Sequence, residues 1–242
     1  MRSVIGWVAC AGLIGGMAVG VGGCGGDDFG TTVSLPADQR HKLPDALEPG
    51  TVIKLPSPTS FNIHDKRWQG TPGPNGKANP SADATPKGTA HCKADGSNGG
   101  VSSAEFQLGH CIDNPTDKAV KAEIKMTIDY EHACKAEGEG AKTVGMYSIK
   151  AFVKDTAGRI LQTMPLSVHT SDDGQVAWSG KERTVAEVTF QPGLGYYIVL
   201  AGRAEASSLA KTSSSASVNV KSFELQIICK SATTTGPTAK GS

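Results

Sequence analysis

The sequence carries little net charge and, beyond its first two dozen residues, has no long stretch of helical period. The missing period argues against an all-helical fold. Lys and Arg number 24 against 23 for Asp and Glu, and no basic run exceeds two residues. This balance gives no electrostatic reason to expect nucleic acid or an anionic membrane surface as a partner. Hydrophobic residues at 38% and charged residues at 19% are both low, so part of the chain is expected to remain unpacked.

The motifs that signal catalysis are also missing. The sequence contains no G-x-S-x-G elbow and no H-E-x-x-H pair. Gly138–Thr143 (GEGAKT) lacks the glycines that a phosphate-binding loop needs, and it joins two predicted strands instead of opening a helix. We therefore expect neither an enzyme nor a cofactor, and an enzyme whose site uses no recognisable motif stays open as an alternative.

Metal sites are not predicted either. Three histidines stand next to or near a cysteine, in His91-Cys92, His110-Cys111 and His132-Ala133-Cys134. Adjacent residues on a strand point to opposite faces, so these pairs do not converge on one ion, and zinc spacings such as C-x-x-C are absent. Four carboxylates that could bind calcium fall in predicted turns, where aspartate is common anyway: Asp113, Asp117, Asp172 and Asp173.

The start of the chain has the layout of a secretory signal. Met1–Ser3 carries one positive charge, and the segment from Val4 to Val21 carries none. Glycine and aspartate follow this segment in place of a basic cluster, which favours a cleaved signal peptide over a permanent spanning helix. We therefore predict export, with the signal over residues 1–23.

The junction Val21-Gly22-Gly23-Cys24 resembles the lipobox of bacterial lipoproteins, although leucine is commoner than valine at its first position. The resemblance covers the first 24 residues only. It implies that Cys24 becomes the first mature residue, carries palmitate-type acyl chains and anchors the protein to a membrane of the bacterial envelope, periplasmic or surface-facing. Several acyl chains would hold it stably, at ~0.8 kcal/mol per buried methylene. The alternative is an ordinary signal with a spare cysteine; Cys10 lies too close to the charged start to serve.

The chain changes character near residue 100. Nine of the thirteen prolines lie before it, and Gly70–Gly88 has nearly a linker composition. We predict a semi-extended, mostly irregular tether over residues 24–100, with a coil-like reach of ~45–50 Å. Within it, Thr51–Trp68 has enough apolar residues to dock on the domain as a short strand or two. The sequence then predicts a folded domain over residues 101–230 and a frayed tail over residues 231–242.

Residues 101–230 show the period of β-strands. In Val120–Cys134 one parity is apolar and the other mostly charged, which predicts a half-buried strand. Leu194–Ala206 is apolar on both faces at its centre, as suits an interior strand, and the pattern switches parity near Lys221, as a bulge would cause. Seven or eight such strands with closely spaced turns predict an antiparallel β-sandwich, immunoglobulin-like or jelly roll, of unknown strand order.

Four cysteines remain once Cys10 leaves with the signal and Cys24 is acylated. An even number in an exported domain predicts two disulfides. Cys134 and Cys229 share the inward parity of their strands, whereas Cys111 has the outward parity of its strand, where the segment holding Cys92 could be attached. The predicted pairs are Cys134–Cys229 and Cys92–Cys111, each contributing ~2–4 kcal/mol.

Two tryptophans, Trp178 and Trp68, are candidate ligand-binding residues, because an exposed indole can stack on a sugar ring. The interpretation we favour is that each seals the edge of the core. Phe190–Ile227 loosely resembles the closing strands of jelly-roll carbohydrate-binding modules. We therefore predict a lipid-anchored envelope protein whose sandwich binds a protein or glycan, or has a structural role. The alternatives are a carbohydrate-binding module and an enzyme.

Overall fold

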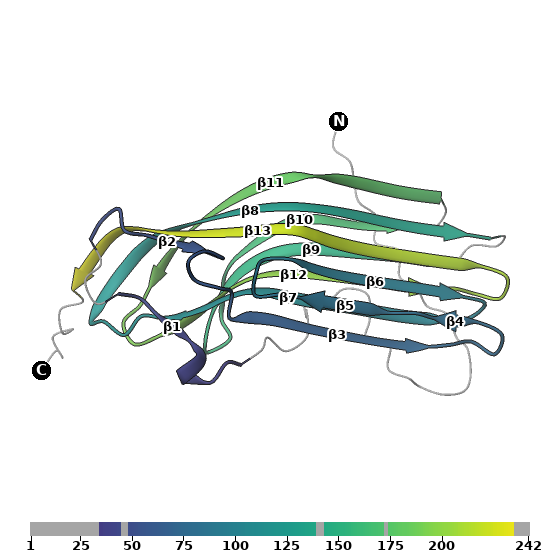
Figure 1. Ribbon diagram of the computed structural model, residues 1–242, viewed down its shortest axis with the longest axis horizontal. Coiled ribbons are helices and arrows are strands. Elements are labelled where there is room, and N and C mark those ends of the chain that lie inside the picture. Colours follow the sequence, from purple (N-terminus) through teal and green to yellow (C-terminus); the bar gives the residue numbers. More distant parts are fainter. Residues whose placement is uncertain (1–33, 45–47, 139–142, 172–173, 235–242) are drawn as a thin grey trace, which may run out of the picture.

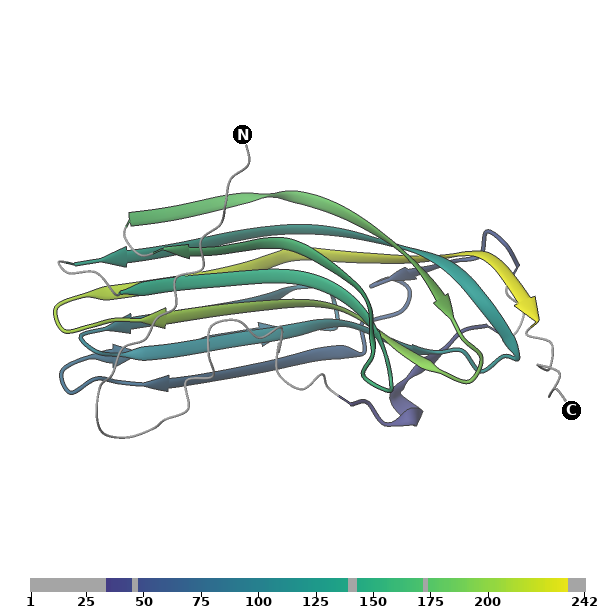
Figure 2. The same cartoon turned by 180° about the vertical axis from the view of Figure 1, so that it is seen from behind.

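The computed structural model describes residues 34–44, 48–138, 143–171 and 174–234. These residues form two β-sheets packed face to face around one main apolar core (Figure 1). Figure 2 shows the same elongated pair of sheets from behind. The predicted all-β sandwich is therefore confirmed. The predicted signal and Cys24 lie outside the described residues. Across the described ranges, no helix has the length and hydrophobicity needed to span a membrane.

One sheet has six strands within the described chain. Its order is β1–β7–β12–β9–β10, and β3 also pairs with β7. All its pairings are antiparallel except that of β1 with β7. The strands are β1 (His41–Lys42), β3 (Ile63–Thr71), β7 (Val101–Asp113), β9 (Val144–Asp155), β10 (Ile160–Ser171) and β12 (Gly195–Ser207).

The facing sheet has seven strands in the same described residues. Its order is β11–β8–β13–β6–β4, with β2 paired to β13 and β5 paired to β6. The edge strand β11 and the edge strand β10 of the other sheet lie on the same side of the sandwich. The strands are β2 (Val52–Leu55), β4 (Lys77–Ala78), β5 (Ser81–Ala84), β6 (Ala90–Ser97), β8 (Lys118–Glu137), β11 (Gly174–Phe190) and β13 (Ser213–Thr234).

The alternation of the sequence explains the long strands. Along β8 the residues of one parity, such as Ile124 and Ile128, are buried in the core, while the charged residues between them reach the surface. Strand β12 lies between β7 and β9 and is buried on both faces along its first half. The register of β13 against β8 shifts between Val220 and Ser222, which confirms the predicted bulge.

The prediction of a mostly irregular tether over residues 24–100 is wrong for the described part of that segment, although the expected docking of Thr51–Trp68 as short strands is confirmed by β2 and β3. Strands β1 to β6 all lie within residues 24–100, and β3 and β6 pair with the long strands β7 and β13. Phe61 stacks on Phe223 of β13, with ring centroids 4.9 Å apart and planes at 8°. The sandwich therefore begins near residue 41. It also extends past residue 230, because β13 continues to Thr234.

Residues 34–44, which we call the strap, run from the outer face of the six-stranded sheet, where Leu35 packs, to its edge, where β1 pairs with β7 and Leu43 enters the main core. The strap contains the 3₁₀ turn η1 (Ala37–Gln39) and β1. Leu35 joins a second apolar cluster, separate from the main core, whose members alternate along β7 and β12 with core-facing residues. This cluster comprises Leu35, Ile63, Cys111, Phe152, Tyr197, Val199 and Ala201.

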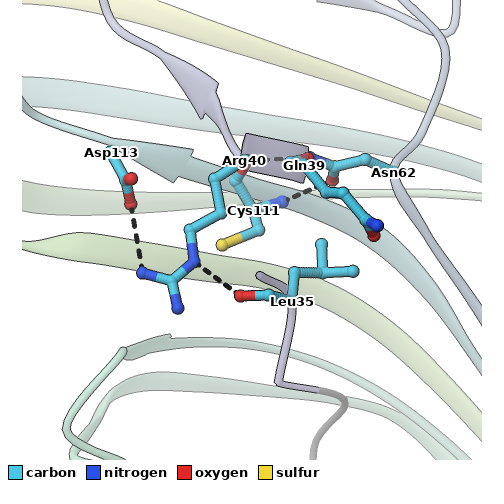
Figure 3. A network of polar contacts seen from close by, with 6 residues as sticks. All are labelled: Leu35, Gln39, Arg40, Asn62, Cys111 and Asp113. Carbon is cyan, nitrogen blue, oxygen red and sulfur yellow. Dashed lines mark hydrogen bonds and ion pairs between the residues drawn. The ribbon is translucent and has the colours of Figure 1, made fainter. Parts of the chain in front are cut away.

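Polar contacts fix the strap to the sheet (Figure 3). Arg40 Nε donates to the Leu35 carbonyl at 2.8 Å, and its guanidinium lies 3.8 Å from the Asp113 carboxylate. Asn62 Nδ2 donates to the carbonyls of Gln39 and Cys111 at 3.0 Å each, and Asn62 Oδ1 accepts from the Cys111 amide at 2.7 Å. The strap is thus held on the domain by hydrogen bonds and an ion pair.

Candidate functional site

Four aromatic rings lie one after another across the side of the sandwich where the two edge strands meet. Trp178 on β11 faces His132 on β8, His132 faces Tyr147 on β9, and Tyr147 faces His169 on β10. Successive centroids are 5.4, 4.1 and 6.1 Å apart, with planes at 18°, 25° and 26°. We call these four residues the ring stack.

Strand register places the ring stack. Trp178 is directly opposite His132 in the β11–β8 pairing, and His169 is directly opposite Tyr147 in the β10–β9 pairing. Side chains opposite each other on one sheet face are near neighbours, so each pair is set by backbone hydrogen bonding. The contact between His132 and Tyr147 then joins the two sheets.

The two ends of the ring stack reach solvent and its middle does not. The side chain of Trp178 is 40% exposed and His169 is half-buried, whereas His132 and Tyr147 are 7% and 2% exposed. The indole lies over Gly180, where a Cβ would fall 2.5 Å from Trp178 Cζ2. A side chain at that position would have to displace the indole, so glycine is what lets Trp178 lie along the strand.

The buried middle of the ring stack is polar. The Tyr147 hydroxyl is 3.2 Å from His132 Nε2 and 3.1 Å from Ser167 Oγ. The other ring nitrogen of His132, Nδ1, is buried and has no hydrogen-bond partner among the described residues. Burial lowers the pKa of His132, and nearby His169 lowers it further. The imidazole of His132 is therefore neutral at pH 7, with one nitrogen still able to bond.

A carboxylate is linked to the exposed indole through Tyr130. Tyr130 on β8 lies with its ring centroid 5.0 Å from that of Trp178, and its hydroxyl donates to Glu182 Oε1 at 3.0 Å. Burial, and then the bond to Glu182, raise the pKa of Tyr130, so the phenol stays protonated and remains the donor. Glu182 is half-buried on the same face of β11 as Trp178. The site therefore combines a flat apolar surface with hydrogen-bonding groups.

Both tryptophans reach solvent, since Trp178 is 40% exposed and Trp68 is 54% exposed, although Trp178 also covers the buried rings of Tyr130 and His132. The structure does not bring the two tryptophans together. Trp68 on β3 is level with Tyr147 through the registers of β7 and β12, but it lies three strands away at the opposite edge, roughly 14 Å across the sheet. Trp178 alone of the two joins the ring stack.

The structure contradicts both predicted disulfides, because the four cysteines of the domain are buried thiols. Cys229 is opposite Ala122 of β8, about a dozen residues and roughly 40 Å along that strand from Cys134. A disulfide requires Cα atoms within about 7 Å. Cys92 lies in the main core and Cys111 in the cluster beneath the strap, on the outer face of the other sheet. Burial raises the pKa of the Cys111 thiol to about 12.

The described residues contain no group of three or more His, Cys, Asp or Glu side chains that could hold a metal. Asp113 ends β7 and faces Arg40, Asp117 lies in the turn before β8, and Asp172 and Asp173 fall outside the described residues. His110 Nε2 lies 2.9 Å from His41 Nδ1, a distance at which one ring donates to the other.

Comparison with known proteins identifies no family: no family model and no curated protein matches the chain. Among solved structures, it is similar to the CBM22-1 xylan-binding domain of Paenibacillus barcinonensis Xyn10C, with 13% identity over 76% of this chain and 98% of that one, at a TM-score of 0.22. The Endo-D glycoside hydrolase domain of Streptococcus pneumoniae gives 14% identity, 67% and 21% coverage, and a TM-score of 0.24. TM-scores this low do not show that this chain and the two solved structures share a topology.

Sequence reasoning did not find Tyr147, His169 or Glu182. Each has the inward parity of its strand, which is typical of core positions. The one available signal was the unusual presence of ionisable and aromatic side chains at inward positions of the strands. The contacts among them depend on how β8, β9, β10 and β11 are aligned.

Proposed function

We propose that this chain is a lipid-anchored protein of the bacterial envelope whose β-sandwich binds a partner and catalyses no reaction. The observation that carries the location is Cys24, placed after a signal-like segment in Val21-Gly22-Gly23-Cys24. Acyl chains on that cysteine would hold the protein on a membrane. The observation that supports binding is the exposed end of the ring stack, since Trp178 is held on a paired strand and yet reaches solvent.

Lipidation is tested by growing cells that express the full chain in radiolabelled palmitate. We expect label on the wild-type protein and none on the Cys24→Ala variant, which should also leave the membrane fraction. Cys10→Ala is the matched control and should label like the wild type after processing. Equal labelling of the wild type and Cys24→Ala would exclude lipidation at Cys24.

A second candidate function, carbohydrate binding, is supported by the setting of Trp178. Glycan sites combine an aromatic platform with a few placed polar groups. Trp178 has Tyr130 and His132 around it, and Glu182 is bonded to the Tyr130 hydroxyl. A glycan array probed with wild type and Trp178→Ala separates this candidate from a protein partner. Wild-type binding that the substitution removes would favour the glycan, and pull-down from native envelope addresses a protein.

A further inference from the structure

We infer that the exposed face of Trp178 is a subsite for one pyranose ring of a neutral or amino-substituted glycan, and that Glu182 disfavours uronic acids there. This rests on the carbohydrate-binding candidate above. The subsite consists of Trp178, backed by the rings of Tyr130 and His132, with Glu182 bonded to Tyr130. It lies on the side of the sandwich where the edge strands β10 and β11 meet.

The indole is organised before any ligand arrives. It lies over Gly180, and the rings of Tyr130 and His132 lie 5.0 and 5.4 Å from it. A pyranose ring presents a flat face of C–H groups, which stacks well on such an indole. Because the side chain is already held, little conformational freedom is lost on binding. Exposure and prior packing together distinguish Trp178 from a surface residue without a role.

The polar groups around the indole match sugar hydroxyls. Glu182 accepts one hydrogen bond from Tyr130, whose ring packs on the indole, and has further acceptor capacity. The Nδ1 atom of His132 is also buried without a partner among the described residues. A buried nitrogen of this kind normally has a hydrogen bond, so the ring behind the indole keeps unused bonding capacity.

The charge around the subsite is negative. Lys181 and Arg183 have the opposite parity on β11 and line a surface groove on the outer face of the seven-stranded sheet, together with Lys125. His132 is neutral at pH 7 because burial lowers its pKa. Glu182, linked to the indole through Tyr130, is therefore the acidic side chain of the subsite, and a second carboxylate, brought by a uronic acid, would be repelled. An amino sugar would not.

The test is titration calorimetry with the full chain in a sugar-free detergent at pH 7. The probes are three tetrasaccharides: a neutral glucose oligomer, a glucosamine oligomer and a galacturonic acid oligomer. We expect the first two to bind, and the acidic one to bind at least about tenfold more weakly. Trp178→Ala should weaken binding at least about tenfold, Trp178→Phe less, and Trp68→Ala not at all.

Glu182→Gln tests the charge while keeping an acceptor for Tyr130. It should remove most of the discrimination against the acidic oligomer. Thermal unfolding of each variant shows whether it folds. If Trp178→Ala does not fold, the comparison of Trp178→Phe with the wild type tests the subsite.

Binding that survives Trp178→Ala unchanged would overturn the subsite and leave the carbohydrate candidate standing. Tight binding of the acidic oligomer to the wild type would overturn the charge argument. No binding of any probe would overturn the subsite, whereas the lipid anchor is judged separately by labelling.

Discussion

Protonation of buried His110 is expected to destabilise the protein in mild acid. Its side chain is 1% exposed; Nε2 lies 2.9 Å from His41, and Nδ1 is buried with no partner in the described part of the chain. Burial, and then the neighbouring His41, lower the pKa of His110 to about 3. A histidine in the unfolded chain titrates near ~6.5. Between these two pKa values, His110 is protonated in the unfolded state and neutral in the folded state.

The sign and size of the effect follow from linkage. Stability contributed by the neutral His110 is fully present above about pH 6.5 and is lost as pH falls toward 3. The loss is ~1.4 kcal/mol per pH unit, or about 2 kcal/mol between pH 6.5 and 5. His132, whose pKa is also lowered by burial, adds to the same slope. The pKa of Glu131 is lowered by its bond to Lys221, so this carboxylate titrates below that window.

The assay is urea unfolding at pH 7, 6 and 5 for wild type, His110→Gln and His64→Gln. His64 is an exposed histidine on β3 and serves as the matched control. Between pH 7 and 5 the wild type and His64→Gln should lose about 2 kcal/mol more than His110→Gln. The comparison uses slopes, so a uniformly weaker variant does not affect it. Parallel pH profiles for the wild type and His110→Gln would refute the reasoning.

Two further predictions concern the core and one turn. In a variant lacking Cys10 and Cys24, the four buried thiols should resist Ellman's reagent at pH 8 in the native protein and should all react after unfolding without reductant; fewer than four would show that disulfides form. Asn114→Ala should lower the free energy of unfolding by about 3 kcal/mol, because Asn114 Nδ2 donates to the carbonyls of Lys118 and Phe190 at 2.8 and 3.0 Å. Asn79 is exposed, so Asn79→Ala, measured by the same urea unfolding, should lower the free energy of unfolding far less. Equal losses for the two variants would contradict the role given to Asn114.

The strands with clear two-residue periodicity could be predicted from the sequence. The parity of β8, the two buried faces of β12 and the bulge between Val220 and Ser222 are all local consequences of which side chains water excludes. The Pro- and Gly-rich segment could be predicted only in part, because the apolar residues of Thr51–Trp68 indicate docking whereas β6 gains its order from neighbours. Lys66 on β3 pairs with Asp83 on β5, and Phe61 stacks on Phe223. Composition does not report which residues the segment meets.

Parity indicates a face but not a distance, which explains the error over the cysteines. Cys134 and Cys229 do face the same core, yet the register of β13 on β8 separates them along the strands. The same limit hid the ring stack. That His132 faces inward follows from its strand, but its neighbours Trp178 and Tyr147 follow only from how β11 and β9 are aligned.

Because the strap is held on the sheet, it limits the distance between the domain and the proposed lipid anchor. Ten residues separate Cys24 from Ser34, a span of at most ~36 Å when fully extended. The strap meets β7 at Ile112, whereas the level of Tyr147 corresponds to Ala104, roughly 26 Å further along the strand. With a lipid on Cys24, one end of the sandwich would stay close to the bilayer. Trp178 would then lie nearer the end that is farther from the membrane.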